Sequence, residues 1–194
     1  MTDFHFFAYL SRMRYIDRWA LMRNSEKENI QEHSHMVAVL AHALAEIRNQ
    51  YFDGEVDGGQ AALAALYHDA PEILTGDLPT PIKYFNSQIN TAYKDLEDLA
   101  SEKLIGKLPE ELKPDYRGFI LADKTTEEHK IMKAADRIAA YIKCAEEVKS
   151  GNKEFLKAKK SIGADIRAID DEAVKYFISN ILPSFEKTLD ELEL

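Results

Sequence analysis

The chain has 194 residues, and 45% of them are hydrophobic, which is enough for one ordinary domain with a buried core and argues against disorder. Its 25 Lys and Arg against 34 Asp and Glu give a net charge of -9, which repels phosphate backbones and argues against a dedicated nucleic-acid binder, although a local basic pocket stays compatible with it. No apolar run approaches the ~20 residues that span a bilayer. The single cysteine, Cys144, cannot form an internal disulfide, which fits a reducing compartment. We therefore expect a cytoplasmic protein that binds neither membranes nor nucleic-acid polymers.

Helix-forming residues dominate the chain, and only 8 Gly and 6 Pro interrupt them, so the sequence predicts an all-α fold. The predicted helices cover residues 4–17, 29–50, 60–69, 87–107, 125–149 and 153–181. Start signals for two of them are Asn29 with Glu32 and Thr125 with Glu128, each a cap residue followed three positions later by a glutamate. Residues 76–81 contain two prolines and are expected to form a stiff loop.

Other breaks are expected where glycine or proline interrupts the helical pattern. These residues are Gly58 and Gly59 before the third helix, Pro109 and Pro114 after the fourth, Gly151 after the fifth and Pro183 after the last.

His33, a residue of a type that binds metal ions, lies in the predicted helix over residues 29–50. It lies four residues before Val37 and seven before Leu40, so helical spacing places it on the apolar face that packs into the core. By itself this position suits a structural core histidine at least as well as a metal ligand.

The pair His68-Asp69 ends the predicted third helix. Neighbouring helical residues point about 100° apart, so both side chains can bind one ion only near the end of the helix, where Pro71 places that end. The alternative is an ordinary polar pair at a helix terminus.

Asp136 stands between pairs of alanines in a helix whose isoleucines face the core. An unpaired buried carboxylate costs several kcal/mol. Asp136 therefore needs a cation, a hydrogen-bond donor or an exposed position, and a structural Arg partner is the alternative to a metal ion.

Together these residues follow the order H…HD…D, which resembles the HD-domain metal-dependent phosphohydrolases, whose ligands come from different helices. Over nearly its whole length the chain further resembles the bacterial HD-domain 5'-deoxynucleotidases. The strings that carry this resemblance are HFFAYLSRMRYIDRW, EHSHMVAVLAHALA, LYHDAPEILTGDLPTPIKYFNS and KAADRIAAYIKCAEEV. The central GDLPTPIKYFN is highly specific, whereas an HD pair alone is weak.

The resemblance implies an HD-domain helical bundle with additional N- and C-terminal helices. Residues 1–194 would form a single HD-type domain, with the metal-site core at about residues 30–142. It also implies a homodimer and one divalent metal cation. A donor set of two imidazoles and two carboxylates does not decide between Co, Mn and similar transition metals. The implied ligands are His33, His68, Asp69 and Asp136.

Glu72 follows His68 by four residues, so a continuing helical turn would place its carboxylate near the same ion, although Pro71 weakens this step. The resemblance gives Glu72 the role of handling the attacking water. The alternative is an exposed carboxylate in the first turn of a helix.

Arg18 can make two parallel hydrogen bonds to a phosphate, and the resemblance implies that Arg18 and Trp19 touch the substrate. Packing of Trp19 against the sugar C2' would exclude a 2'-hydroxyl. On sequence alone, a helix-end arginine beside a core tryptophan is the simpler interpretation. Asp77 can accept a hydrogen bond from the sugar or assist the leaving oxygen, so Glu72, Asp77 and Arg18 are the expected catalytic residues. The expected substrate-binding residues are Arg18, Trp19, Asp69, Asp77, Leu78, Pro79, Thr80 and Asp136.

The expected activity is hydrolysis of deoxyribonucleoside 5'-monophosphates to a deoxynucleoside and phosphate. A second hypothesis keeps the site but changes the substrate to a deoxynucleoside triphosphate or a cyclic phosphodiester. A third is a non-catalytic HD scaffold that binds nucleotide.

Overall fold

The computed structural model describes residues 4–192. Within this range the chain is helical, and its only β-type pairing is an isolated bridge between Asp17 and Asn29. The helices are α1 (Phe6–Leu10), α2 (Ile30–Tyr51), α3 (Gly58–Tyr67), α4 (Glu72–Thr75), α5 (Thr80–Lys83), α6 (Ser87–Ile105), α7 (Lys113–Ile120), α8 (Glu127–Lys149), α9 (Leu156–Arg167) and α10 (Glu172–Asn180). The predicted all-α class is confirmed. Among the described residues, no helix combines the length and hydropathy that crossing a bilayer requires.

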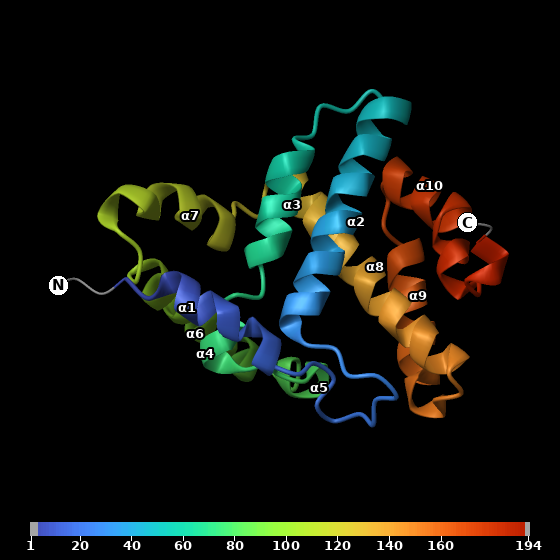
Figure 1. The fold of residues 1–194 in the computed structure, drawn as a ribbon, viewed down its shortest axis with the longest axis horizontal. Helices are drawn as coiled ribbons and strands as arrows, with labels where there is room; N and C mark the ends of the chain where they lie inside the picture. The colour runs from blue at the N-terminus through green and yellow to red at the C-terminus, as the bar shows by residue number, and fades with distance from the viewer. Residues whose placement is uncertain (1–3, 193–194) are drawn as a thin grey trace.

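The larger part of the core lies where α2 and α8 cross (Figure 1), with α3, α9 and α10 packed around them. Alanines let these helices approach closely: Ala41 and Ala45 on α2 and Ala135 on α8 are almost fully buried. Each long helix therefore exposes one face and buries the opposite one, as its apolar spacing predicts.

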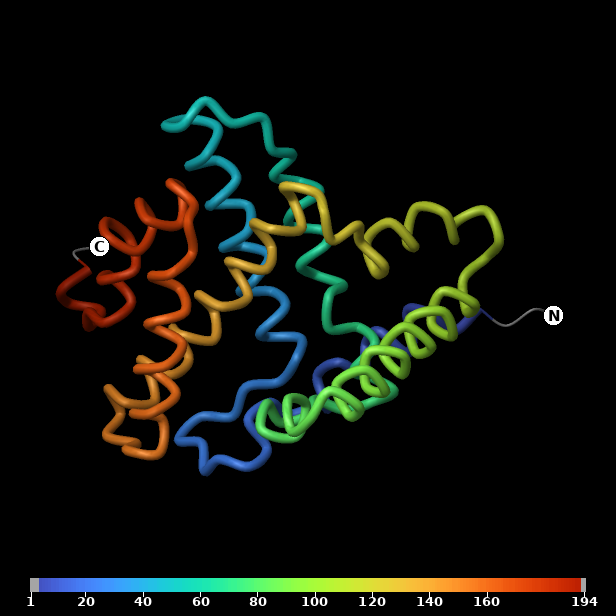
Figure 2. The backbone as a smooth tube through the Cα atoms, turned by 180° about the vertical axis from the view of Figure 1, so that it is seen from behind, coloured from blue at the N-terminus to red at the C-terminus, as the bar shows by residue number. Residues whose placement is uncertain are grey.

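A second apolar cluster joins α1, α6 and α7 and includes Phe6, Leu104 and Ile120. It lies beside the first cluster along the long axis, as the view from behind shows (Figure 2). Ala70, in the turn that follows α3, is buried in this second cluster. The segment after α3 thus leaves one cluster and enters the other, and the predicted site residues 68–80 lie along it.

The start of α2 follows the predicted capping pattern. The Asn29 side chain accepts hydrogen bonds from the backbone N–H groups of Gln31 and Glu32, and the Glu32 side chain accepts one from the Asn29 N–H. The backbone N–H of His33 then donates to the Asn29 carbonyl at 3.1 Å. This capping box fixes His33 in the first turn of α2.

Some predicted boundaries are wrong for reasons of local chemistry. The first helix ends at Leu10 and continues as a 3₁₀ segment, Ser11–Tyr15. Helix α8 is capped by Thr126, whose hydroxyl accepts from the His129 N–H, and not by Thr125. Glu128 instead accepts a hydrogen bond from the backbone of Asp57, the residue that caps α3.

The predicted helix over residues 153–181 is divided, because the Asp171 side chain accepts from the Val174 N–H and starts α10 anew. The expected loop over residues 76–81 contains the start of α5, with Pro81 in its first turn. Pro114 stands similarly in α7. A proline in the first turn removes an N–H that has no helical partner, so it favours a start there. Gly151 does end the α8 region, with φ of 88°.

Candidate active site

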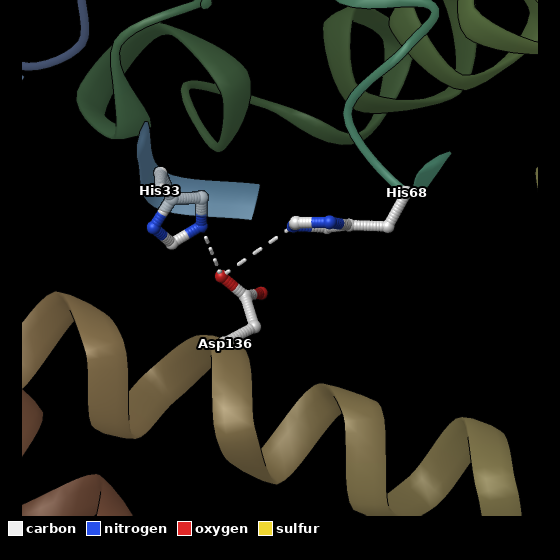
Figure 3. Close-up of side chains that lie close together, drawn as sticks. All are labelled: His33, His68 and Asp136. Atoms are coloured by element: carbon white, nitrogen blue, oxygen red, sulfur yellow. Dashed lines mark hydrogen bonds and ion pairs between the residues drawn. The ribbon is translucent and has the colours of Figure 1, made fainter. Parts of the chain in front are cut away.

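Three side chains from distant parts of the chain point toward one another (Figure 3). His33 comes from α2, His68 caps the C-terminus of α3, and Asp136 lies in the middle of α8. Oδ1 of Asp136 is 3.1 Å from Nε2 of His33 and 3.9 Å from Nε2 of His68. One potential ligand atom of each residue lies within 4.8 Å of the others.

Asp69 lies at the edge of the same group. Its Oδ1 is 3.1 Å from Nε2 of His68, and its Oδ2 is 3.7 Å from Nε2 of His33. Helix α3 ends at Tyr67, and the next residues form a turn in which the Ala70 N–H donates to the Tyr67 carbonyl. Because the chain leaves the helix at this turn, the side chains of His68 and Asp69 are not held about 100° apart and lie at the same cluster. The position of Pro71 predicted this end of the helix.

The geometry of His68 fits a metal ligand. Its Nδ1 lies 2.7 Å from the Ala65 carbonyl, and because only a protonated nitrogen can donate there, a neutral ring presents an unprotonated Nε2 to the carboxylates of Asp69 and Asp136. This Nε2 is buried and has no hydrogen-bond partner among the described residues. Burial lowers the pKa of His68, which favours the neutral ring. A lone pair facing two carboxylates is satisfied by a cation, and the donor set suits a divalent transition metal.

Asp136 has a cationic neighbour that the sequence pattern left unassigned. The Lys133 Nζ lies 2.6 Å from Oδ2 of Asp136, whereas the neighbouring Arg137 pairs with Asp165 at 3.2 Å. Burial opposes ionisation of Asp136, but the hydrogen bond from His33 and the charge of Lys133 hold its pKa well below the usual value. The alternative of a structural Arg partner is therefore wrong, and the i,i+3 spacing of Lys133 was the signal for the actual one.

Glu72 is buried, with 8% of its surface exposed, at the first position of α4. Burial, followed by the negative charges of Asp69 and Asp77, raises its pKa to about 10. The alternative of an exposed carboxylate is therefore wrong. A carboxyl group with a raised pKa beside a metal-binding cluster can exchange protons with a water molecule.

Arg18 and Asp77 complete the charged lining. Burial opposes the charge of Arg18, but Glu28, Asp69, Asp136 and Asp77 together raise its pKa. Its Nη1 is buried without a hydrogen-bond partner among the described residues. Burial raises the pKa of Asp77, and the positive charge of Arg18 partly offsets this rise. An arginine tip surrounded by carboxylates, with a free donor, can bind a phosphate once a cation offsets the negative charge.

Trp19 packs against the short 3₁₀ segment Lys153–Phe155 that follows α8. Its ring packs against Phe155 with centroids 5.4 Å apart, and a hydrogen bond from its backbone N–H partly offsets the rise in the pKa of Asp77. The loop residues Leu78 and Pro79 are partly buried, whereas Thr80 is exposed. Within residues 4–192 no hydrogen bond joins the Thr80 side chain to the cluster, so its contact with substrate stays a prediction.

Three other residues of metal-binding or nucleophilic type are not part of this cluster. His35 and His42 are exposed on other faces of α2. Burial raises the pKa of the Cys144 thiol to about 12, which agrees with a packing residue and not with a nucleophile.

Comparisons with known proteins agree with this geometry. The family model described as "5'-deoxynucleotidase YfbR-like" matches residues 5–185. A 5'-deoxynucleotidase of Vibrio cholerae is 49% identical over 99% of this chain and 100% of its own length. The 5'-deoxynucleotidase YfbR of Escherichia coli is 49% identical over 99% of this chain and 97% of its own.

Solved structures show the same fold. An HD-domain phosphohydrolase of Listeria innocua superposes with a TM-score of 0.83 at 27% identity, covering 93% of this chain and 88% of that one. The cyanophage S-2L HD phosphohydrolase DatZ, bound to dA and one catalytic Zn²⁺, has a TM-score of 0.62 at 18% identity, over 93% of this chain and 96% of its own. The family resemblance of the sequence is thus confirmed: the chain belongs to the YfbR-like 5'-deoxynucleotidases, among the HD-domain phosphohydrolases.

Proposed function

We propose that this enzyme hydrolyses deoxyribonucleoside 5'-monophosphates to a deoxynucleoside and phosphate, with one divalent metal ion held by His33, His68, Asp69 and Asp136. The observation that carries this proposal is the buried Nε2 of His68, which has no hydrogen-bond partner among the described residues and faces the carboxylates of Asp69 and Asp136. The relatives in Vibrio cholerae and Escherichia coli, matched over nearly their full lengths, are 5'-deoxynucleotidases.

The charge of the site explains why a cation belongs to it. Up to four carboxylates lie near the Arg18 guanidinium, on Asp69, Glu72, Asp77 and Asp136. Their negative charges would repel an anionic phosphate. A bound divalent cation supplies Lewis acidity, which polarises the phosphoryl oxygens and makes a water molecule more acidic. Arg18 donates hydrogen bonds to the phosphoryl oxygens and stabilises the charge that develops on them.

Glu72 and Asp77 are assigned to the proton transfers. Glu72 accepts a proton from the water whose oxygen attacks phosphorus, and the bond from phosphorus to the 5' oxygen breaks in the same displacement. Asp77 gives a proton to that leaving oxygen, a role that its raised pKa supports. A divalent cation held by Asp69 would offset part of the negative charge that raises the pKa of Glu72, and this would favour the carboxylate form of Glu72 as a base.

Trp19 is assigned to the selection of the sugar, with its ring against C2'. Leu78, Pro79 and Thr80 are assigned to the nucleotide, on the segment that leads into α5. A ring that fills the space of a 2'-hydroxyl leaves that hydroxyl buried without a partner and so disfavours ribonucleotides.

Four further properties belong to the proposal. Residues 1–194 act as one HD-type domain, because α9 and α10 share the core of α2 and α8. A homodimer stays a prediction from the family resemblance, which light scattering tests. A cytoplasmic location and Co or Mn as the native metal stay predictions, tested by cell fractionation and by metal analysis of the purified protein.

The decisive experiment measures phosphate release from metal-reconstituted protein. The substrates are matched deoxy- and ribonucleoside 5'-monophosphates, 3'-monophosphates, triphosphates and cyclic phosphodiesters. Release of phosphate from deoxy 5'-monophosphates above all others supports the proposal. Pyrophosphate from triphosphates, or cleavage of diesters alone, would assign another HD activity, and tight nucleotide binding without turnover would indicate a scaffold.

A further inference from the structure

The loop that carries Arg18 and Trp19 is closed at its base by backbone pairing. The Ile30 N–H donates to the Ile16 carbonyl at 3.0 Å, and the Arg18 N–H donates to the Glu28 carbonyl at 2.8 Å. Glu28 therefore lies directly opposite Arg18 and one residue before the cap of α2. The base of this loop is joined to the helix that supplies His33.

The Glu28 side chain touches both residues that are assigned to the substrate. Its Oε2 accepts a hydrogen bond from Nε1 of Trp19 at 3.0 Å and lies 3.5 Å from Nε of Arg18. The side chains of Glu28 and Arg18 are 16% and 14% exposed, so solvent screens this ion pair weakly. One carboxylate oxygen thus serves both the indole and the guanidinium.

Both contacts leave free the part of each group that the proposed chemistry uses. Binding through Nε of Arg18 leaves the Nη atoms at the tip of the fork for phosphate oxygens. Binding through Nε1 holds the Trp19 indole by its edge and leaves a face of the ring available for the sugar. Trp19 also has φ of 59°, a backbone conformation that bulky residues rarely adopt and that surrounding contacts must hold.

The other end of the loop is anchored independently of Glu28. The Glu147 carboxylate on α8 accepts hydrogen bonds from the backbone N–H groups of Ser25 and Glu26. Lys143 Nζ donates to the Glu26 carbonyl and to Glu147. Loss of the Glu28 side chain therefore leaves the loop attached to α8.

We propose that Glu28 is a positioning residue that orients Arg18 for the phosphate and Trp19 for the deoxyribose through a single carboxylate oxygen. This inference rests on the proposed roles of Arg18 and Trp19. The two contacts of Glu28 differ chemically, because the indole needs only a hydrogen-bond acceptor whereas the guanidinium needs a negative charge.

The test compares Glu28→Gln, Glu28→Ala and the control Glu26→Gln, which removes an exposed carboxylate of the same loop. Glu28→Gln keeps an acceptor for Trp19 but removes the charge, so KM for deoxynucleoside monophosphates rises about 10-fold while the preference for deoxy over ribo substrates is kept. Glu28→Ala loses both contacts, so KM rises and the preference for deoxy substrates falls about 10-fold. Glu26→Gln matches the parent in both.

Trp19 is the one tryptophan of the chain, so intrinsic fluorescence reports its surroundings without any substrate. Glu28→Ala shifts the emission maximum and exposes the ring to acrylamide quenching, whereas Glu28→Gln keeps the parental emission. Parental emission and parental sugar preference in Glu28→Ala, with folding confirmed by circular dichroism, would overturn the proposal. Equal losses in the Gln and Ala variants would also overturn it. If the parent lacked nucleotidase activity, the proposed function would fail, while the fluorescence would still decide whether Glu28 places Trp19.

Discussion

Nε2 of His33 lies 3.1 Å from Oδ1 of Asp136, although 103 positions separate these residues in the chain. One is held by the capping box of α2 and the other by the close packing of α8. The crossing of two helices through small residues thus brings an imidazole and a carboxylate to the place where His68 and Asp69 arrive from α3.

Substitution of Asp136 should disrupt metal binding. Asp136→Asn removes a negative ligand while keeping nearly the same volume, so we expect metal affinity to fall about 100-fold or more, with turnover falling in parallel. Mass spectrometry of bound metal and phosphate release measure the two effects. Asp165→Asn is the matched control, because Asp165 is exposed and pairs with Arg137 away from the cluster. Full metal retention in Asp136→Asn would contradict this ligand assignment.

Substitution of Glu72 should separate chemistry from binding. Glu72→Gln keeps the shape of the buried side chain but cannot accept a proton, so we expect kcat to fall by about 10²- to 10⁴-fold. Metal content and nucleotide affinity should stay near parental values, as measured by mass spectrometry and calorimetry. A kcat close to the parental value would remove Glu72 from the reaction.

Trp19→Ala tests the selection of the sugar. Opening the space against C2' should lower the ratio of kcat/KM for deoxyadenosine over adenosine 5'-monophosphate, by up to about 100-fold. Trp19→Phe keeps an apolar ring and should retain most of the preference. If ribonucleotides were rejected as strongly by Trp19→Ala as by the parent, the sugar would be selected elsewhere.

Metal removal should affect both activity and stability. Chelation should abolish phosphate release, and Mn²⁺ or Co²⁺ should restore it. An ion at 100 times its dissociation constant adds about 2.7 kcal/mol to the free energy of unfolding, which thermal denaturation detects. His35→Gln, on an exposed face of α2, should respond to metal like the parent. Undiminished turnover in protein verified to be metal-free would refute the metal requirement.

Glu147 should make stability depend on acidity. Burial opposes its ionisation, but hydrogen bonds from Lys143, Ser25 and Asn152 lower its pKa to about 2, against a usual value of 4.5. Because its pKa is lower in the folded than in the unfolded chain, Glu147 stabilises the fold by about 3 kcal/mol at pH values well above 4.5. This contribution is lost as the pH falls from 4.5 toward 2.

The corresponding measurement is urea unfolding of the parent and Glu147→Gln between pH 6 and pH 3.5. The stability advantage of the parent should shrink by about 1 kcal/mol over this range. Glu111→Gln, at an exposed position, should leave the pH dependence unchanged. A constant difference between the parent and Glu147→Gln would contradict the depressed pKa.

The sequence predicted those features that local patterns determine. The apolar spacing of α2 placed His33 on the buried face, and Pro71 indicated where α3 ends. Asn29 with Glu32 predicted the capping box that the structure shows. Each of these signals lies within a few residues of the feature it predicts, so no knowledge of tertiary packing was needed.

Features that depend on competition between neighbouring groups could not be predicted in the same way. Thr125 and Thr126 are equivalent as caps by type, but the backbone and hydroxyl of Thr125 both donate to the Asp123 side chain, and Thr126 caps α8. The sequence suggested only an arginine as the structural partner of Asp136, whereas Arg137 pairs with Asp165 on α9 and Lys133 pairs with Asp136. The contacts of Glu28 depend on a loop that closes across a gap of nine or ten residues, which carries no periodic signal.

The distribution of the cluster over α2, α3 and α8 has a consequence for synthesis of the protein in the cell. A nascent chain can collect His33, His68 and Asp69 early, but Asp136 follows only after the whole second apolar cluster has been translated. A truncated product that stops before α8 therefore lacks one of the four proposed ligands, and we expect it to hold no metal ion and to have no phosphatase activity.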